Sequence, residues 1–169
     1  MKVIKAKTAG FCFGVKRAVD TVYKQVDTKC GQIYTYGPII HNEEVIKDMR
    51  DKGVIVLRSE EDLDMISQGT VIIRSHGVEK RIYEKIEQKG LRIVDATCPF
   101  VKKIHNIVSE KSGEGFHIII IGNPEHPEVV GIKGWAKDNV TVIQSAEDAE
   151  CFTADRKEKI CIVSQTTFN

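Results

Sequence analysis

Short apolar runs alternate along this chain with amphipathic stretches of helical period, and this alternation most constrains the fold. The run at 117–121 is almost wholly apolar, whereas apolar residues recur at helical spacing over 15–26. Runs of four or five apolar residues are typical of strands, and their regular alternation with helices is typical of α/β proteins. We therefore predict an α/β fold of two similar small units around a central cleft. The predicted strands are 3–6, 33–36, 54–57, 70–74, 92–95, 117–121, 140–143 and 160–163. The predicted helices are 15–26, 42–52, 78–88, 99–111 and 146–151, together with a short helix that opens at 59–61.

Composition narrows the class of protein. A chain of 169 residues has room for one ordinary domain or two small ones, and 41% hydrophobic residues suit a core-forming chain. The formal net charge of +1 argues against a nucleic-acid binder that works through bulk electrostatics. We find no apolar run long enough to span a membrane and no signal-peptide pattern at the amino terminus, so we expect a cytoplasmic protein without a membrane partner.

The five cysteines are odd in number and widely spread, which does not favour a disulfide framework. Cys12 lies in a glycine-bounded loop after a predicted strand, where a buried packing role and a ligand role are equally open. Cys98 lies where a predicted strand ends and Pro99 opens a helix, a place that stabilises a thiolate. We interpret the remaining three as packing residues: Cys30, Cys151 and Cys161.

Histidines and a carboxylate occupy the other strand-to-helix loops. In open α/β sheets ligands bind in such loops, at the carboxyl ends of the strands. His41 and His76 lie in glycine-containing turns ahead of helices, which suits a phosphate or diphosphate, although each could simply cap its helix. His126 and Glu128 lie two residues apart in a proline-stiffened loop and form a natural proton-delivery pair. His105 and His117 fit ordinary structural roles.

Dispersed residues must carry the chemistry, because no glycine-rich nucleotide motif and no Cys-x-x-Cys motif occurs. Two alternatives stay open on the residues alone. One is an enzyme with a Cys98 nucleophile and a histidine base. The other is a zinc- or diphosphate-binding module that uses Cys12, Cys98 and a histidine.

Taken together, the loop motifs resemble those of one enzyme family, 4-hydroxy-3-methylbut-2-enyl diphosphate reductase (IspH/LytB). Their order and spacing agree with the family as well as their content, from the first predicted strand to the last residue. The motifs are Gly10-Phe11-Cys12-Phe13-Gly14-Val15, Ile40-His41-Asn42, Ser75-His76-Gly77-Val78, Asp95-Ala96-Thr97-Cys98-Pro99, His126-Pro127-Glu128-Val129 and Ser164-Gln165-Thr166-Thr167.

The resemblance implies a function and a role for each of these positions. The family reductively removes an allylic hydroxyl from a small diphosphate in the last step of the non-mevalonate isoprenoid route. The resemblance implies a [4Fe–4S] cluster held by Cys12, Cys98 and a third cysteine, and a ferredoxin or flavodoxin as electron donor. It further implies roles for five other residues: His41, His76 and His126 in binding the diphosphate, Glu128 in donating a proton with help from His126, and Thr166 in orienting the substrate hydroxyl.

The resemblance also implies that part of the family's chain is missing. The family has a third module that carries the third cluster cysteine, and residues 164–169 stop where a helix should follow. We therefore expect a fragment with little activity alone, in which 1–12 would pack on the third module, 13–97 form the first α/β unit, and 98–169 form the second.

Overall fold

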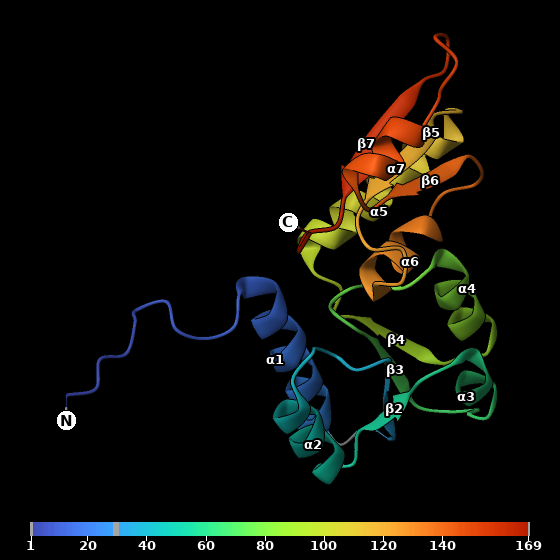
Figure 1. The fold of residues 1–169 in the computed structure, drawn as a ribbon. Helices are drawn as coiled ribbons and strands as arrows, with labels where there is room; N and C mark the ends of the chain where they lie inside the picture. The colour runs from blue at the N-terminus through green and yellow to red at the C-terminus, as the bar shows by residue number, and fades with distance from the viewer. Residues whose placement is uncertain (1, 29–30, 169) are drawn as a thin grey trace.

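Two parallel β-sheets, each covered by helices, organise the chain in the computed structural model, which describes residues 2–28 and 31–168 (Figure 1). Each strand lies within one residue of its predicted bounds, except for the first predicted strand. The α/β prediction is confirmed. The elements in chain order are α1 (Phe13–Thr28), β1 (Ile33–Tyr36), α2 (Glu43–Asp51), β2 (Ile55–Leu57), α3 (Glu60–Asp64), β3 (Thr70–Ile73), α4 (Lys80–Gln88), β4 (Arg92–Asp95), α5 (Pro99–Gly113), β5 (His117–Ile121), α6 (Pro127–Lys133), β6 (Val140–Ile143), α7 (Ala146–Cys151) and β7 (Ile160–Ser164).

The two sheets share one topology. The first has the strand order β2-β1-β3-β4 and the second has the order β6-β5-β7, and every pairing is parallel. In each sheet the chain forms a central strand, adds the next strand on one side, and returns to add another on the opposite side. Parallel strands need crossover helices, which explains why helices alternate with strands in the sequence. The domain boundaries at residues 12 and 97 stay predictions.

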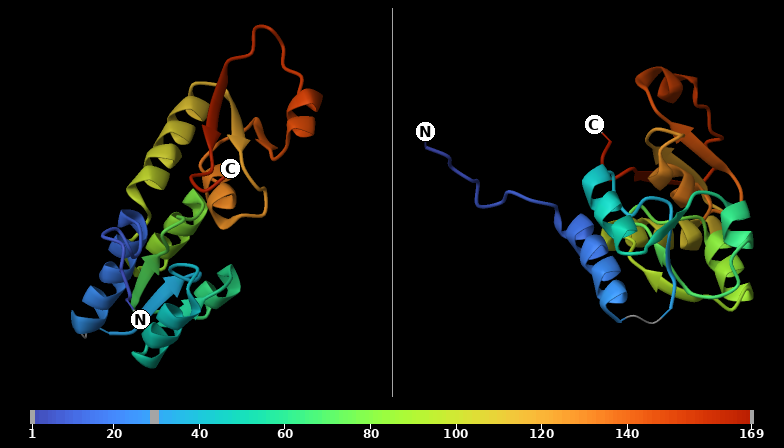
Figure 2. Two further views of the ribbon diagram at one scale, coloured as in Figure 1. Left: turned by 60° about the vertical axis from the view of Figure 1, so that its left-hand side comes forward. Right: turned by 90° about the horizontal axis from the view of Figure 1, so that it is seen from below.

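Three apolar clusters form the core. One packs α1 and α2 against one face of the first sheet, the second packs α3 and α4 against the other face, and the third packs α5 and α6 against the second sheet (Figures 1 and 2). The strand β3 is buried along its whole length, which explains the apolar run that follows Thr70. Each helix of these three clusters thus owes its apolar stripe to the sheet face that it covers.

One predicted strand is absent from the structure, and one observed helix was not predicted. Residues 3–6 form no strand: Val3 is 80% exposed, Ile4 is 78% exposed, and the segment extends away from the described remainder of the chain (Figures 1 and 2). A strand needs a partner for its backbone groups, and no described strand pairs with this segment. In addition, α6 was not predicted, because it is only seven residues long and contains Gly131.

No helix among the described residues is both long and apolar enough to cross a bilayer. The predicted packing role of Cys30 lies outside the described residues.

Candidate functional site

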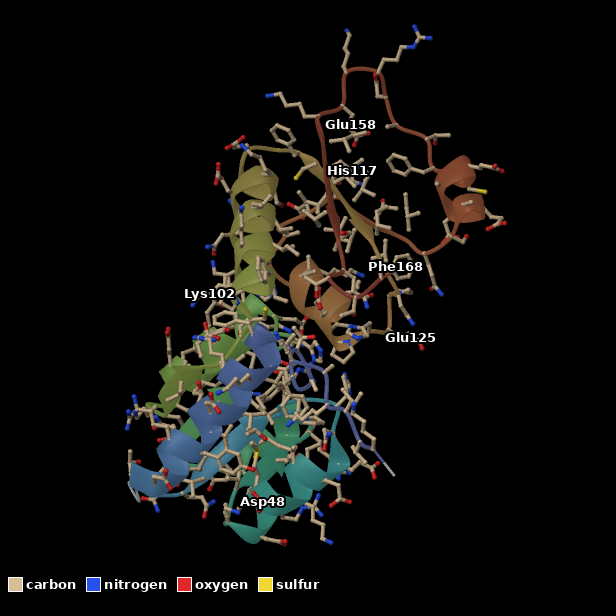
Figure 3. The ribbon with its side chains drawn as sticks, turned by 90° about the vertical axis from the view of Figure 1, so that its left-hand side faces the viewer. Asp48, Lys102, His117, Glu125, Glu158 and Phe168 are labelled. Atoms are coloured by element: carbon tan, nitrogen blue, oxygen red, sulfur yellow. The ribbon has the colours of Figure 1, made fainter. Side chains whose placement is uncertain are left out.

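The candidate site lies where the carboxyl ends of the two sheets meet. In each sheet the chain adds a strand on one side of the central strand and then adds the next strand on the other side. The position where the side changes is the switch point at which α/β proteins bind ligands. The loops after β1, β3 and β7 carry His41, His76 and Thr166, and Glu128 lies in the first turn of α6, the helix that follows β5. Figure 3 shows Glu125 and Phe168 at the end of the second unit that faces the first. Both switch points therefore contribute residues to one place.

Three histidines converge there from three loops. The ring centroids of His41 and His76 lie 4.9 Å apart, those of His76 and His126 lie 5.3 Å apart, and those of His41 and His126 lie 6.2 Å apart. One ring nitrogen of each lies within 4.8 Å of the others, a spacing that could hold an anion or a metal ion. All three are predicted ligand residues, and the structure brings them together although His41 and His126 are 85 positions apart in the sequence.

Hydrogen bonding fixes what His126 offers to a ligand. Its Nδ1 accepts a hydrogen bond from the backbone N–H of Glu128 at 3.1 Å, so the neutral ring carries its proton on Nε2. That nitrogen is then a donor, which suits an anionic oxygen better than a metal ion. The donor set therefore favours an anion over a metal at the three histidines.

Burial and neighbouring cations keep His76 and His126 uncharged. Burial, together with the positive charges that His41, His126 and Arg74 would carry, lowers the pKa of His76 to about 4. Burial likewise lowers the pKa of His126, aided by His41 and Arg74 and opposed by Glu128. At neutral pH His76 and His126 thus present neutral N–H donors, and a bound anion would favour their protonation.

Glu128 is completely buried and is held by Thr166. Its Oε1 accepts from the backbone N–H of Thr166 at 2.6 Å, and its Oε2 accepts from the Thr166 hydroxyl at 2.7 Å. The loop after β7 is fixed in turn by the side chain of Gln165, whose Oε1 accepts from the backbone N–H of Asn123 at 3.1 Å. These bonds join the loops after β5 and β7, and they place a carboxyl group beside a hydroxyl group.

Cys12 and Cys98 line one cavity of about 590 Å³, together with Thr166. Both are free thiols. Cys12 reaches the cavity from the start of α1 and not from a strand end, because its predicted strand does not form. Glycine at position 14 lets the start of α1 lie close to Cys98, since a Cβ at that position would lie 2.6 Å from the Cys98 sulfur. The aromatic rings of Phe13 and Phe100, both 67% exposed, also line the cavity.

Backbone contacts hold the Cys98 loop against its neighbours. The backbone N–H of Cys98 donates to the Ser75 carbonyl at 2.8 Å, and the Ser75 hydroxyl donates to the Ile39 carbonyl at 3.0 Å. From α1, the guanidinium of Arg17 donates to the Thr97 carbonyl at 2.9 Å. The cysteine loop and the two histidine loops of the first unit therefore form one connected structure.

Arg74 belongs to the site although the sequence did not single it out. Its side chain is partly buried, its Nε donates to the Gly77 carbonyl at 3.3 Å, and its charge lowers the pKa of His76 and His126. Gly37 has a φ of +73°, which favours glycine, and a Cβ there would lie 2.5 Å from the Arg74 Nη1. The missed signal is a cationic residue at the carboxyl end of a buried strand, which places its charge at the ligand edge of the sheet.

The remaining cysteines and histidines were interpreted as structural, and one interpretation is wrong. Cys161 packs against the third apolar cluster, as predicted, but Cys151 is exposed because α7 buries none of its residues. His117 is structural: its ring bonds Glu158 and Thr141 at 2.8 Å each, and Figure 3 shows it farther from the first unit than Glu125 and Phe168. His105 is buried and stacks on Trp135.

The fold and the site define an α/β protein with a cluster of three histidines and a cavity that two thiols line. Residues 3–169 match a protein-family model described as LytB protein, and the chain belongs to that family.

Curated relatives named 4-hydroxy-3-methylbut-2-enyl diphosphate reductase match almost the whole chain. The protein of Caldanaerobacter subterraneus is 48% identical over 99% of this chain, and that of Thermoanaerobacter sp. is 49% identical over 99%. In both cases the match covers 58% of the relative, so this chain spans little more than half the length of these relatives.

Two solved reductase structures also match almost the whole of this chain. The reductase of Plasmodium falciparum is 32% identical and superposes with a TM-score of 0.89 over 96% of this chain and 50% of that one. A second structure, described as (E)-4-hydroxy-3-methyl-but-2-enyl diphosphate reductase, the terminal enzyme of the non-mevalonate pathway, is 39% identical with a TM-score of 0.82. It covers 99% of this chain and 59% of that one.

Proposed function

We propose that this chain supplies most of the substrate site of a 4-hydroxy-3-methylbut-2-enyl diphosphate reductase and needs the remainder of the family's length for activity. The observation that carries the proposal is the convergence of three histidines, the Glu128–Thr166 pair and two free thiols at the meeting point of the two sheets. Reduction of the substrate consumes two electrons and two protons, breaks the allylic C–O bond, forms a C–H bond and releases water.

Cys12 and Cys98 are the residues of this chain that would hold a [4Fe–4S] cluster. The cavity fits this group, because it has a volume of about 590 Å³, its walls are mainly apolar and its two thiols are unpaired. When bound, the cluster would supply the electrons and a Lewis-acidic iron at one open position. A ferredoxin or flavodoxin would deliver those electrons.

His41, His76 and His126 would bind the diphosphate. The donor Nε2–H of His126 can bond a phosphate oxygen, and the negative charge raises the tendency of His76 to take up a proton. Arg74 adds a positive charge close enough to His76 to act on its protonation. The diphosphate group would thus anchor the substrate at the histidines while its hydroxyl end reaches toward the thiol-lined cavity.

Glu128 would hold the proton for the leaving oxygen, and Thr166 would pass it on. The Thr166 hydroxyl contacts Glu128 Oε2 on one side and lines the thiol cavity on the other. In this chain both Glu128 oxygens accept from Thr166. Proton delivery would reverse the second bond: a protonated Oε2 would donate to Thr166 Oγ1 while the Thr166 hydroxyl donates its own proton to the substrate oxygen. The Glu128 end of that route is buried, whereas Thr166 is exposed in this chain.

The zinc-binding alternative from the sequence has less support. The group of three metal-ligating side chains that converge among the described residues contains histidines alone, with neither Cys12 nor Cys98 among them. A zinc site made of both cysteines and a histidine therefore lacks the convergence that it requires.

The test measures iron, zinc and acid-labile sulfide in anaerobically prepared protein. We compare this chain with a full-length hybrid, in which the chain replaces the matching 58% of the Caldanaerobacter relative. About four iron and four sulfide per hybrid, with reductase activity, would support the proposal. Zinc without sulfide in the hybrid would refute it.

A further inference from the structure

His105 is a buried histidine that the proposed chemistry does not use. It lies on α5, is 1% exposed, and its Nε2 has no hydrogen-bond partner among the described residues. The ring is nearly parallel to that of Trp135, with centroids 5.0 Å apart and an angle of 17°. A buried ring nitrogen without a partner is costly, so the contacts of this ring with its surroundings must compensate.

The His105 ring supports the turn that carries His76. Gly77 follows His76 with a φ of +70°, and a Cβ at Gly77 would lie 2.5 Å from His105 Cε1. The same hypothetical Cβ would lie 3.1 Å from Thr97 Cγ2, in the residue before Cys98. The ring therefore contacts the backbone of the His76 turn directly and lies next to the Cys98 loop.

Trp135 connects the same turn to the second unit. Its Nε1 donates to the Val78 carbonyl at 2.9 Å, two residues after His76. Trp135 lies just beyond the carboxyl end of α6, whose amino-terminal cap is His126. A Cβ on Gly131 of α6 would lie 3.6 Å from the His76 carbonyl, so helix and turn are in close contact.

We propose that His105 and Trp135 are positioning residues that set the distance between His76 and His126. The two histidines come from different units, and the stacked rings lie at the junction of α5, α6 and the His76 turn. Ring packing, and not a hydrogen bond from Nε2, performs this task, because Nε2 has no partner among the residues that the structure describes. The inference rests on the proposed function only in taking diphosphate as the ligand.

The experiment compares three variants of this chain with the parent. His105→Ala removes the ring, His105→Phe keeps a flat ring of similar size, and Val108→Ala deletes buried apolar volume from the same helix without touching the turn. Calorimetry measures the affinity for inorganic diphosphate. NMR measures the nuclear Overhauser contact between the His76 and His126 rings, which requires no ligand, and thermal unfolding measures stability.

We expect His105→Ala to weaken inorganic diphosphate binding by at least about tenfold and to lose the contact between the two rings. We expect His105→Phe to keep both within about twofold of the parent, and Val108→Ala to be less stable but unchanged in both. An intact ring contact in His105→Ala, an equal loss of affinity in Val108→Ala, or a loss in His105→Phe would overturn the inference. If the parent itself bound no diphosphate, the proposed anchor would fail while the ring contact still decided the inference.

Discussion

Thr166 bonds both carboxylate oxygens of Glu128, one through its backbone N–H at 2.6 Å and one through its hydroxyl at 2.7 Å. A fully buried carboxyl group is stable only when its oxygens have partners. The same arrangement leaves the Thr166 hydroxyl in contact with the cavity where substrate would lie. One residue pair therefore serves both the stability of the junction and the proposed proton route.

Glu128→Gln should separate these two roles. An amide accepts only one of the two bonds, so the free energy of unfolding should fall by about 1–3 kcal/mol. Loss of the proton donor should lower the turnover of the full-length hybrid by about 100-fold or more. Chemical denaturation and single-turnover kinetics measure the two effects. Glu125→Gln, on the exposed loop before α6, is the matched control and should change neither; equal kinetic losses in both variants would contradict the assignment.

Diphosphate binding should be coupled to proton uptake. His76 has a pKa of about 4 in the ligand-free chain because of burial and nearby positive charge, and a bound anion should raise that pKa toward neutrality. Affinity should therefore increase as the pH falls from 8 to 6. Calorimetry in buffers of different ionisation enthalpy should detect up to about one proton taken up per ligand, after correction for the titration of diphosphate itself. His76→Gln should show less uptake, and unchanged uptake would assign the proton elsewhere.

Acid should destabilise the fold through His105. Burial lowers its pKa from 6.5 to about 4, so between these values the unfolded chain binds more protons and the free energy of unfolding rises with pH. The contribution is complete above pH 6.5 and should be reduced by about 2 kcal/mol at pH 5. Urea unfolding followed by circular dichroism should show a shallower pH dependence in His105→Phe than in the parent. Identical pH profiles would contradict the burial of a neutral His105.

Gly14→Ala should disturb the thiol cavity. The added Cβ would lie 2.6 Å from the Cys98 sulfur, so the thiol or the start of α1 must move. We expect the full-length hybrid to lose most of its iron and sulfide, measured by colorimetric assay. Gly113→Ala is the matched control, because a Cβ at that helical glycine meets nothing within 4 Å. Normal iron and sulfide content in Gly14→Ala would show that the thiol tolerates displacement.

The local elements followed from the sequence because their signals are local. The apolar runs of β1, β4, β5 and β6 have the predicted bounds, and the Ser59 side chain caps α3 as its position before Glu60 and Glu61 indicates. The helix α6 escaped prediction because a seven-residue element is stabilised by its packing, with Val129 and Ile132 completely buried, more than by its own periodicity.

The sequence by itself determined the alternation of strands and helices, and it identified the loops that carry the candidate ligand residues. Only the tertiary structure decided which side chains meet: His41 and His126 are brought within 6.2 Å, and Arg74 joins their electrostatic environment. It also decided that residues 3–6 form no strand among the described residues, because a strand depends on a partner that lies elsewhere in the fold. Backbone propensity is encoded over a few neighbouring residues, whereas contact across the junction of two sheets depends on the packing of the whole chain.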